Sequence, residues 1–185
     1  MQTPGAEPHC NPAAPFVPGA GHSRFYQRLH RRYENDLAVL PAGTPVRATM
    51  EQAYDALRAR GCDTGTALRM LRQVVMERLI RLDCEAQAPL DDITTAVTVL
   101  AELALDRACV QARQELDERH GAPTGPDGQP VQLWIIGMGK LGARELNVSS
   151  DIDLIYVYEH DGETAGQPDG RGVLSNHEYF GRAVK

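Results

Sequence analysis

The chain has 185 residues and a formal net charge of −6, with 19 Lys and Arg residues against 25 Asp and Glu residues. Since affinity for a nucleic-acid backbone comes mainly from Lys and Arg side chains that neutralise phosphates, this balance argues against a nucleic-acid partner. No apolar run reaches the roughly 18 residues that a membrane helix needs, and the first residues lack the features of a signal peptide. We therefore expect a cytoplasmic protein without membrane contact, of one domain or slightly more.

The four cysteines argue against two further classes of protein. No two of them form a Cys-x-x-Cys pair, so the sequence gives no support for a zinc ribbon; the cysteines are Cys10, Cys62, Cys84 and Cys109. Their spacing also matches no secreted disulfide framework, and we expect four reduced thiols.

The N-terminal part predicts a tail followed by a helical unit. Residues 1–22 are rich in proline and have too little apolar surface to offset the entropy of ordering, so we expect a disordered tail. Residues 23–121 predict a helical lead-in region of four helices. These helices are expected from Ser23 as N-cap to Leu40, over Arg47–Arg60, around Leu68–Leu82, and from Asp91 as N-cap to His120 before Gly121.

Helical spacing predicts which residues of the third and fourth helices are buried. The third helix places Leu68, Leu71, Val75, Leu79 and Leu82 on one face, and leaves Arg69, Arg72, Glu77 and Arg81 off it. The buried face of the fourth helix is expected to carry Ile93, Val97, Leu100 and Ala104. The basic and aromatic stretch 24–33 allows two interpretations: an amphipathic helix with solvated arginines, or a nucleic-acid patch.

Composition changes after residue 130, where strands are predicted. Val131–Ile136 and Asp151–Tyr158 are short runs of β-forming residues bounded by turn residues. A polar loop over 159–172 and a helix from about Ser175 follow. The sequence therefore predicts an α+β fold with an N-terminal helical unit.

The segment between the two strands contains a glycine pattern with two interpretations. Gly137, Gly139 and Gly142 form Gly-x-Gly-x-x-Gly, and Glu159 lies 22 residues after Gly137, as in a dinucleotide-binding (Rossmann) oxidoreductase. Such a fold needs further βα units, for which about 26 residues remain after Glu159. A Walker A loop is excluded because Lys140 is followed by leucine rather than Ser or Thr.

The second interpretation is nucleotidyl transfer. Asp151 and Asp153 lie two residues apart on the second predicted strand. Because side chains of a strand point alternately to its two sides, both carboxylates would share one side of the sheet, with Ile152 and Leu154 on the other. Neighbouring carboxylates repel one another unless a cation lies between them, and such oxygen ligands suit Mg²⁺. Gly139 and Lys140 form a turn that can bind phosphate, and Ser149 and Ser150 can donate hydrogen bonds. This pattern is typical of nucleotidyltransferases of the DNA polymerase β type.

Residues 137–155 identify a family. The string Gly-Met-Gly-Lys-Leu-Gly-x-x-Glu-Leu-Asn-x-Ser-Ser-Asp-Ile-Asp-Leu-Ile resembles the bacterial bifunctional glutamine synthetase adenylyltransferase/adenylyl-removing enzymes. The resemblance implies an ATP-, ADP- or AMP-binding site in which Asp151 and Asp153 hold Mg²⁺, while Gly137, Gly139, Lys140, Ser149 and Ser150 contact nucleotide or phosphate. It also implies glutamine synthetase as protein substrate and regulation by a PII-type protein.

The resemblance also implies a reaction and its direction. Members carry two similar domains: one adds AMP to a tyrosine of glutamine synthetase, and the other removes it by phosphorolysis, giving ADP. The position of the motif near the N-terminus, and its Ser-Ser-Asp-Ile-Asp string over 149–153, resemble the removing domain.

Two departures from the family pattern limit what this chain is expected to do. Ala143 stands where the family usually has a second glycine, and would be strained if its φ were positive. The third carboxylate of the fold should lie on a later strand, which is absent before Lys185. We therefore expect residues 131–185 to be the first part of a truncated nucleotidyltransferase domain, inactive alone. A non-catalytic helical interaction module remains the other alternative.

Overall fold

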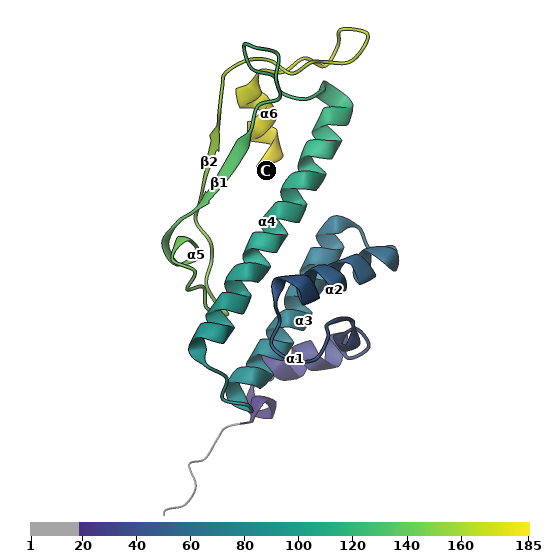
Figure 1. Cartoon of the computed structure of the whole chain (residues 1–185). Helices are drawn as coiled ribbons and strands as arrows, with labels where there is room; N and C mark the ends of the chain where they lie inside the picture. The colour runs from purple at the N-terminus through teal and green to yellow at the C-terminus, as the bar shows by residue number, and fades with distance from the viewer. Residues whose placement is uncertain (1–18) are drawn as a thin grey trace, which may run out of the picture.

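The computed structural model describes residues 19–185, and Figure 1 shows its arrangement: packed helices at one end, and a small sheet beside a long helix at the other. The helices are α1 (Arg24–Tyr33), α2 (Arg47–Ala59), α3 (Thr64–Cys84), α4 (Leu90–His120), α5 (Gly139–Gly142) and α6 (Asn176–Ala183). Two strands, β1 (Leu133–Gly137) and β2 (Leu154–Tyr158), and two 3₁₀ helices, η1 (Ala20–His22) and η2 (Leu37–Val39), complete the described chain. This combination of elements confirms the α+β class.

Serine N-caps begin two of the helices: Ser23, which was predicted as a cap, and Ser175, where only the start of a helix was predicted. Ser23 Oγ accepts a hydrogen bond from the Tyr26 amide at 3.2 Å, and Ser175 Oγ accepts one from the Glu178 amide at 3.2 Å. Each serine thereby satisfies a backbone donor of the first turn. The prediction that the first helix reaches Leu40 is wrong, because α1 ends at Tyr33.

The end of the predicted tail is ordered rather than disordered. Ala20–His22 form η1, and the side chain of Ala20 is only 1% exposed. The expectation of disorder is therefore wrong for these residues, because η1 packs against α1 and α3. The remainder of the predicted tail, residues 1–18, lies outside the described residues.

The helical unit has one core, formed by α1 to α4 together with the η2 segment, Leu141 and Leu146. Leu71, Val75 and Leu79 of α3 are fully buried, as the helical spacing predicts. Glu77, predicted off the buried face, is only 3% exposed, so that prediction is wrong. Its carboxylate lies 2.9 Å from His30 Nδ1 of α1, and this contact provides a partner for the buried oxygen.

Helix α4 has 31 residues and extends from the helical unit to the sheet (Figure 1). Pro89, not Asp91, is its N-cap, and Asp91 lies within the first turn, where a carboxylate interacts favourably with the helix dipole. Burial of Ile93, Val97 and Leu100 confirms three predicted core residues, whereas Ala104 is only half-buried. The helix ends at Gly121, as predicted, with a φ of 71°.

The two strands are antiparallel and shorter than predicted. β1 begins two residues after Val131, and β2 begins at Leu154, because Leu154 pairs with Gly137, the last residue of β1. Asp151 and Asp153 therefore precede the strand instead of lying on it. The argument that strand alternation places both carboxylates on one side of the sheet is wrong.

A second, smaller core attaches the sheet to α4. Tyr179 and Phe180 of α6 are buried with Val131, and Leu116 of α4 packs against them. Asn176, the first residue of α6, is fully buried. Its side-chain nitrogen Nδ2 donates to the Thr124 and His160 carbonyl oxygens at 3.0 and 2.9 Å. α6 thus connects the segments before β1 and after β2, which flank the same end of the sheet, to the last turns of α4.

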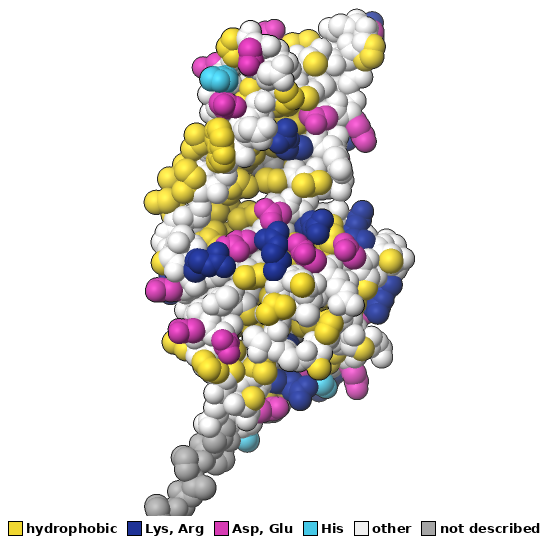
Figure 2. Space-filling model, viewed as in Figure 1, with side chains coloured by type: hydrophobic (Ala, Val, Ile, Leu, Met, Phe, Trp, Pro, Cys, Tyr) yellow, Lys and Arg dark blue, Asp and Glu magenta, His cyan; other side chains and the backbone are white. Residues whose placement is uncertain are grey.

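The face of the sheet that points away from α4 is apolar and exposed. Paired residues share a face, so Trp134 lies beside Val157 and Ile136 beside Ile155. Their exposed fractions range from 41% to 49%. We call these four residues the outer sheet face, and Figure 2 shows hydrophobic side chains gathered over this part of the molecule.

Two further sequence predictions concern chemistry rather than packing. Cys62, Cys84 and Cys109 are free thiols, as predicted, and Cys10 lies outside the described residues. Within residues 19–185, no helix combines the length and the hydrophobicity needed to cross a membrane.

Candidate functional site

The glycine pattern forms a tight turn at the end of β1. Gly139 has a φ of 54°, which is strained for residues with a side chain, and it begins the four-residue helix α5. Gly142 lies so close to β1 that a Cβ there would be 2.5 Å from the Gly137 carbonyl oxygen. Leu141 is buried beneath the turn. We call residues 137–142 the glycine turn.

The strand register brings the glycine turn against the Asp-x-Asp segment. Beyond the last ladder pair, the Met138 amide donates to the Asp153 carbonyl oxygen at 2.9 Å. The phosphate-binding candidates Gly139 and Lys140 therefore directly follow a residue that is hydrogen-bonded to the Asp-x-Asp segment. The structure thus brings together two motifs that the sequence separates by about a dozen residues.

The charged side chains of this region have no protein partners in residues 19–185. Asp151 and Asp153 are exposed, and neither carboxylate makes a hydrogen bond or ion pair with a described residue. Lys140 is likewise exposed, with no hydrogen bond or ion pair to its ammonium group in the described chain. These groups therefore remain available to a ligand.

Two carboxylates without protein partners fit a hard cation such as Mg²⁺. Mg²⁺ is commonly held by one or two carboxylates together with water and substrate phosphates. No group of three or more His, Cys, Asp or Glu side chains in residues 19–185 is placed to hold a metal. The donor set thus resembles one that is completed by substrate oxygens, rather than a closed structural metal site.

The serines before Asp151 form part of a local turn. Ser150 Oγ and the Ser149 amide both donate to Asn147 Oδ1, at 2.9 and 3.1 Å. These bonds organise the backbone that leads into Asp151. Neither serine hydroxyl is bonded to a carboxylate of the motif. Sequence reasoning assigned no role to Asn147, although Asn-x-Ser is a turn-forming pattern.

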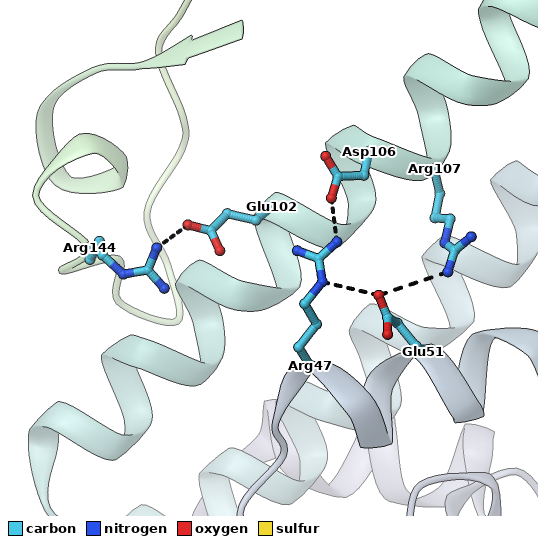
Figure 3. Close-up of polar contacts among 6 residues, drawn as sticks. All are labelled: Arg47, Glu51, Glu102, Asp106, Arg107 and Arg144. Atoms are coloured by element: carbon cyan, nitrogen blue, oxygen red, sulfur yellow. Dashed lines mark hydrogen bonds and ion pairs between the residues drawn. The ribbon is translucent and has the colours of Figure 1, made fainter.

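Two contacts attach the loop after the glycine turn to α4. The Leu146 amide donates to Thr98 Oγ1 at 3.3 Å, and the guanidinium of Arg144 forms an ion pair with Glu102 (Figure 3). Arg144 has a φ of 61°, whereas Ala143 has a φ of −79° and is unstrained. Ala143 was expected to be strained only if its φ were positive, and it is not. The residue with the left-handed backbone is Arg144.

Two hollows border the site. One, of about 450 Å³, lies between α3, α4 and residues 146–152, is mostly apolar, and has Ser150 and Asp151 among its lining residues. The other, of about 670 Å³, lies between α4 and β1 and includes Cys109. Burial raises the pKa of the Cys109 thiol, which favours the protonated form over a reactive thiolate.

The sheet topology does not favour a dinucleotide-binding fold. That fold requires a long helix after the first strand and then a parallel second strand. Here the helix after β1 has four residues, and β2 is antiparallel to β1. The Gly-x-Gly-x-x-Gly pattern alone therefore led to a wrong alternative.

Comparisons with known proteins give the same family as the motif. The sequence profile of the glutamate-ammonia ligase adenylyltransferase family matches residues 21–184. The chain is 43% identical over 152 residues to a Burkholderia pseudomallei protein, and 39% identical over 189 residues to one from Ralstonia nicotianae. A Chromobacterium violaceum protein is 51% identical over 120 residues. All three are named bifunctional glutamine synthetase adenylyltransferase/adenylyl-removing enzyme.

The matched regions differ in their share of the two chains. They cover 79%, 97% and 64% of this chain for the Burkholderia, Ralstonia and Chromobacterium proteins, but only 16%, 19% and 13% of those proteins. The chain therefore spans less than a fifth of the relatives that it matches. Because the family profile covers nearly all described residues, the chain belongs to the glutamate-ammonia ligase adenylyltransferase family.

Proposed function

We propose that this chain is the first part of a nucleotidyltransferase that removes AMP from a tyrosine of glutamine synthetase by phosphorolysis. The observation that carries the proposal is the Met138–Asp153 hydrogen bond, which joins the glycine turn to the Asp-x-Asp segment. The relatives' names, which state both adenylyl transfer and removal, support the substrate and the chemistry.

Each site residue has a role in this proposal. Asp151 and Asp153 hold Mg²⁺, while Gly137 and Gly139 let the backbone approach the phosphates, with Lys140 donating to them. When bound, the metal offsets negative charge on the reacting phosphoryl group. Ser149 and Ser150 either contact the nucleotide or maintain the turn around Asn147.

The proposed reaction needs no side-chain nucleophile. An oxygen of inorganic phosphate attacks the AMP phosphorus, the bond between phosphorus and the tyrosine oxygen breaks, and the tyrosine oxygen takes a proton. The products are ADP and unmodified glutamine synthetase. Removal rather than addition is supported by the likeness of residues 145–153 to the removing domain of the family.

We propose that the nucleotidyltransferase fold of polymerase β type is incomplete over residues 131–185. The two-stranded sheet leaves the outer sheet face exposed, and the chain matches only 16% and 19% of two of its relatives. A later strand carrying a third carboxylate would complete the site. The adding domain, the PII-type regulator and a cytoplasmic location belong to the same proposal.

The test uses the longer protein that contains this chain, with adenylylated glutamine synthetase as substrate. Asp151→Asn and Asp153→Asn should each abolish phosphate-dependent AMP removal and retain ATP-dependent AMP addition. Asp91→Asn, an exposed substitution in the first turn of α4, is the matched control and should leave both reactions unchanged. Loss of addition with retained removal would reverse the assigned direction, and near-normal removal at saturating Mg²⁺ would refute the metal ligands.

A second measurement concerns residues 1–185 alone. We expect no ADP formation from adenylylated glutamine synthetase and phosphate, because the sheet and the carboxylate set are incomplete. Turnover by this chain alone would contradict the proposed truncation and would leave the assigned chemistry in place.

A further inference from the structure

One face of α4 carries three polar residues spaced by four. Thr98, Glu102 and Asp106 lie one above another on the helix surface. Each contacts a different part of the chain: the partners are, in order, the Leu146 amide, the Arg144 guanidinium and the Arg47 guanidinium of α2. Figure 3 shows the two ion pairs, of Glu102 with Arg144 and of Asp106 with Arg47. This face therefore connects the loop after the glycine turn to the helical unit.

Arg144 has an unusual backbone for its residue type. Its φ of 61° lies in the left-handed region, where glycine is favoured and a β-carbon causes strain. The residue follows α5, and its amide donates to the Leu141 carbonyl oxygen at 3.0 Å. A glycine would fit this position without strain. Unlike glycine, the arginine has a side chain that forms an ion pair with Glu102.

The contact acts on the part of the turn that carries Lys140. The Lys140 carbonyl oxygen accepts a hydrogen bond from the Glu145 amide at 2.8 Å, so residues 140 and 145 move together. Arg144 and Leu146, on either side of Glu145, are both held to α4. The direction of the Lys140 side chain thus depends on where α4 holds residues 144–146.

We propose that Arg144 is a positioning residue for phosphate binding by the glycine turn, acting through Glu102. The inference rests on the proposed function, because it assumes that Gly139 and Lys140 contact phosphate. Both side chains are partly exposed, at 55% for Arg144 and 34% for Glu102, and exposed ion pairs contribute little to folding stability. Losing this pair should therefore change ligand affinity more than the unfolding temperature.

The kinetic test uses the longer protein that contains this chain. Arg144→Gly relieves the backbone strain and removes the cation, and Glu102→Gln removes the charge of its partner. Each should raise the KM for inorganic phosphate roughly three- to tenfold, with kcat within about twofold. The unfolding temperature should stay unchanged in Glu102→Gln, which leaves the backbone of residue 144 as it is. Arg144→Lys should recover part of the affinity because it restores a cation.

A matched control separates positioning from a general effect of charge on α4. Asp106→Asn breaks the neighbouring ion pair with Arg47 but leaves the loop after the glycine turn untouched. It should leave the KM for phosphate unchanged. Wild-type KM in Arg144→Gly, or equal changes in Asp106→Asn and Glu102→Gln, would overturn the proposal.

A chemical readout distinguishes this inference from the proposed function. Trace acetylation followed by mass spectrometry measures Lys140 reactivity without Mg²⁺ or nucleotide, and Arg144→Gly and Glu102→Gln should both change it. If reactivity changes while Asp153→Asn still removes AMP normally, the positioning holds and the proposed chemistry fails. If Asp153→Asn abolishes removal but Lys140 reactivity and the KM stay wild-type in both variants, the positioning alone fails.

Discussion

His30 on α1 provides the partner for a carboxylate that α3 buries, since His30 Nδ1 lies 2.9 Å from Oε1 of Glu77. The Glu77 side chain is 3% exposed, whereas His30 is 43% exposed. Tyr26 lies beside them, and burial together with the Glu77 charge raises the pKa of its hydroxyl. The packing of α1 on α3 therefore includes polar contacts around a buried carboxylate.

Removing the imidazole should destabilise the helical unit. His30→Ala leaves a buried carboxylate without this partner, and we expect the free energy of unfolding to fall by about 1–3 kcal/mol. His160→Ala is the control, because His160 and Glu159 are 3.9 Å apart and both exposed. It should change stability by less than about 0.5 kcal/mol. Urea unfolding measures both, and equal effects would contradict the role of His30.

Adding one methyl group to the glycine turn should distort it. A Cβ on residue 142 would lie 2.5 Å from the Gly137 carbonyl oxygen, so Gly142→Ala should destabilise the turn by about 1–3 kcal/mol. Ala143→Gly should not stabilise the chain, because the φ of Ala143 is already −79°. Fluorescence of Trp134, the single tryptophan, follows unfolding next to the turn. Wild-type stability in Gly142→Ala would mean that the turn is not closed.

Lys140 can be followed selectively because the chain has only one other lysine, Lys185. We expect ADP with Mg²⁺ to protect Lys140 from acetylation, by roughly tenfold at ten times the dissociation constant. Lys185 should react equally with and without ADP, which makes it an internal control. Equal reactivity of Lys140 under both conditions, measured by mass spectrometry, would remove it from the proposed phosphate site.

Alkaline pH should loosen α6 from α4 through Tyr179. Burial, and then the 2.6 Å hydrogen bond from its hydroxyl to Asp117, raise the pKa of Tyr179 well above its usual value. Folding therefore favours the protonated phenol, and its contribution is complete below the ordinary tyrosine pKa of about 10. Above that pH the unfolded chain ionises first, so stability should fall as pH rises towards the raised pKa.

Tyr179→Phe isolates this contribution from those of the other tyrosines. The variant should be less stable at neutral pH by about 1 kcal/mol, because one hydrogen bond is lost. Its stability should then decline less steeply above pH 10 than that of the wild type. Urea midpoints measured at several alkaline pH values check this, and parallel declines would show that Tyr179 is not the responsible group.

Local signals were enough to predict several helix ends, but not the end of α1 at Tyr33 or the N-cap of α4 at Pro89. Ser23 and Ser175 act as N-caps, and Gly121 ends α4, because capping depends on residues next to the helix end. Burial of Glu77 could not be predicted in this way, since its partner lies 47 residues earlier on another helix. Spacing along one helix does not show what faces it.

The site was predictable in composition but not in geometry. The motif over residues 137–155 contains Gly139 and Lys140 in one half and Asp151 and Asp153 in the other, and the register of β1 with β2 brings the two halves together. The strand start at Leu154 follows from that register, which no local pattern specifies. The contact between Arg144 and Glu102 could not be predicted, because no sequence pattern indicates an arginine with a left-handed backbone and because the two residues are 42 positions apart.

The length of α4 has a mechanical consequence. A helix of 31 residues is about 46 Å long, so a tilt of about 5° at one end moves the other end by about 4 Å. Because no break interrupts this rod, α6 and the second core at its far end must follow any reorientation of the helical unit. Thr98 and Glu102 lie in the first half of α4, and the loop that they hold is therefore displaced far less than α6. The largest displacement therefore falls on α6 and on the start of β1, which packs with α6 in the second core, while the glycine turn stays closer to the pivot.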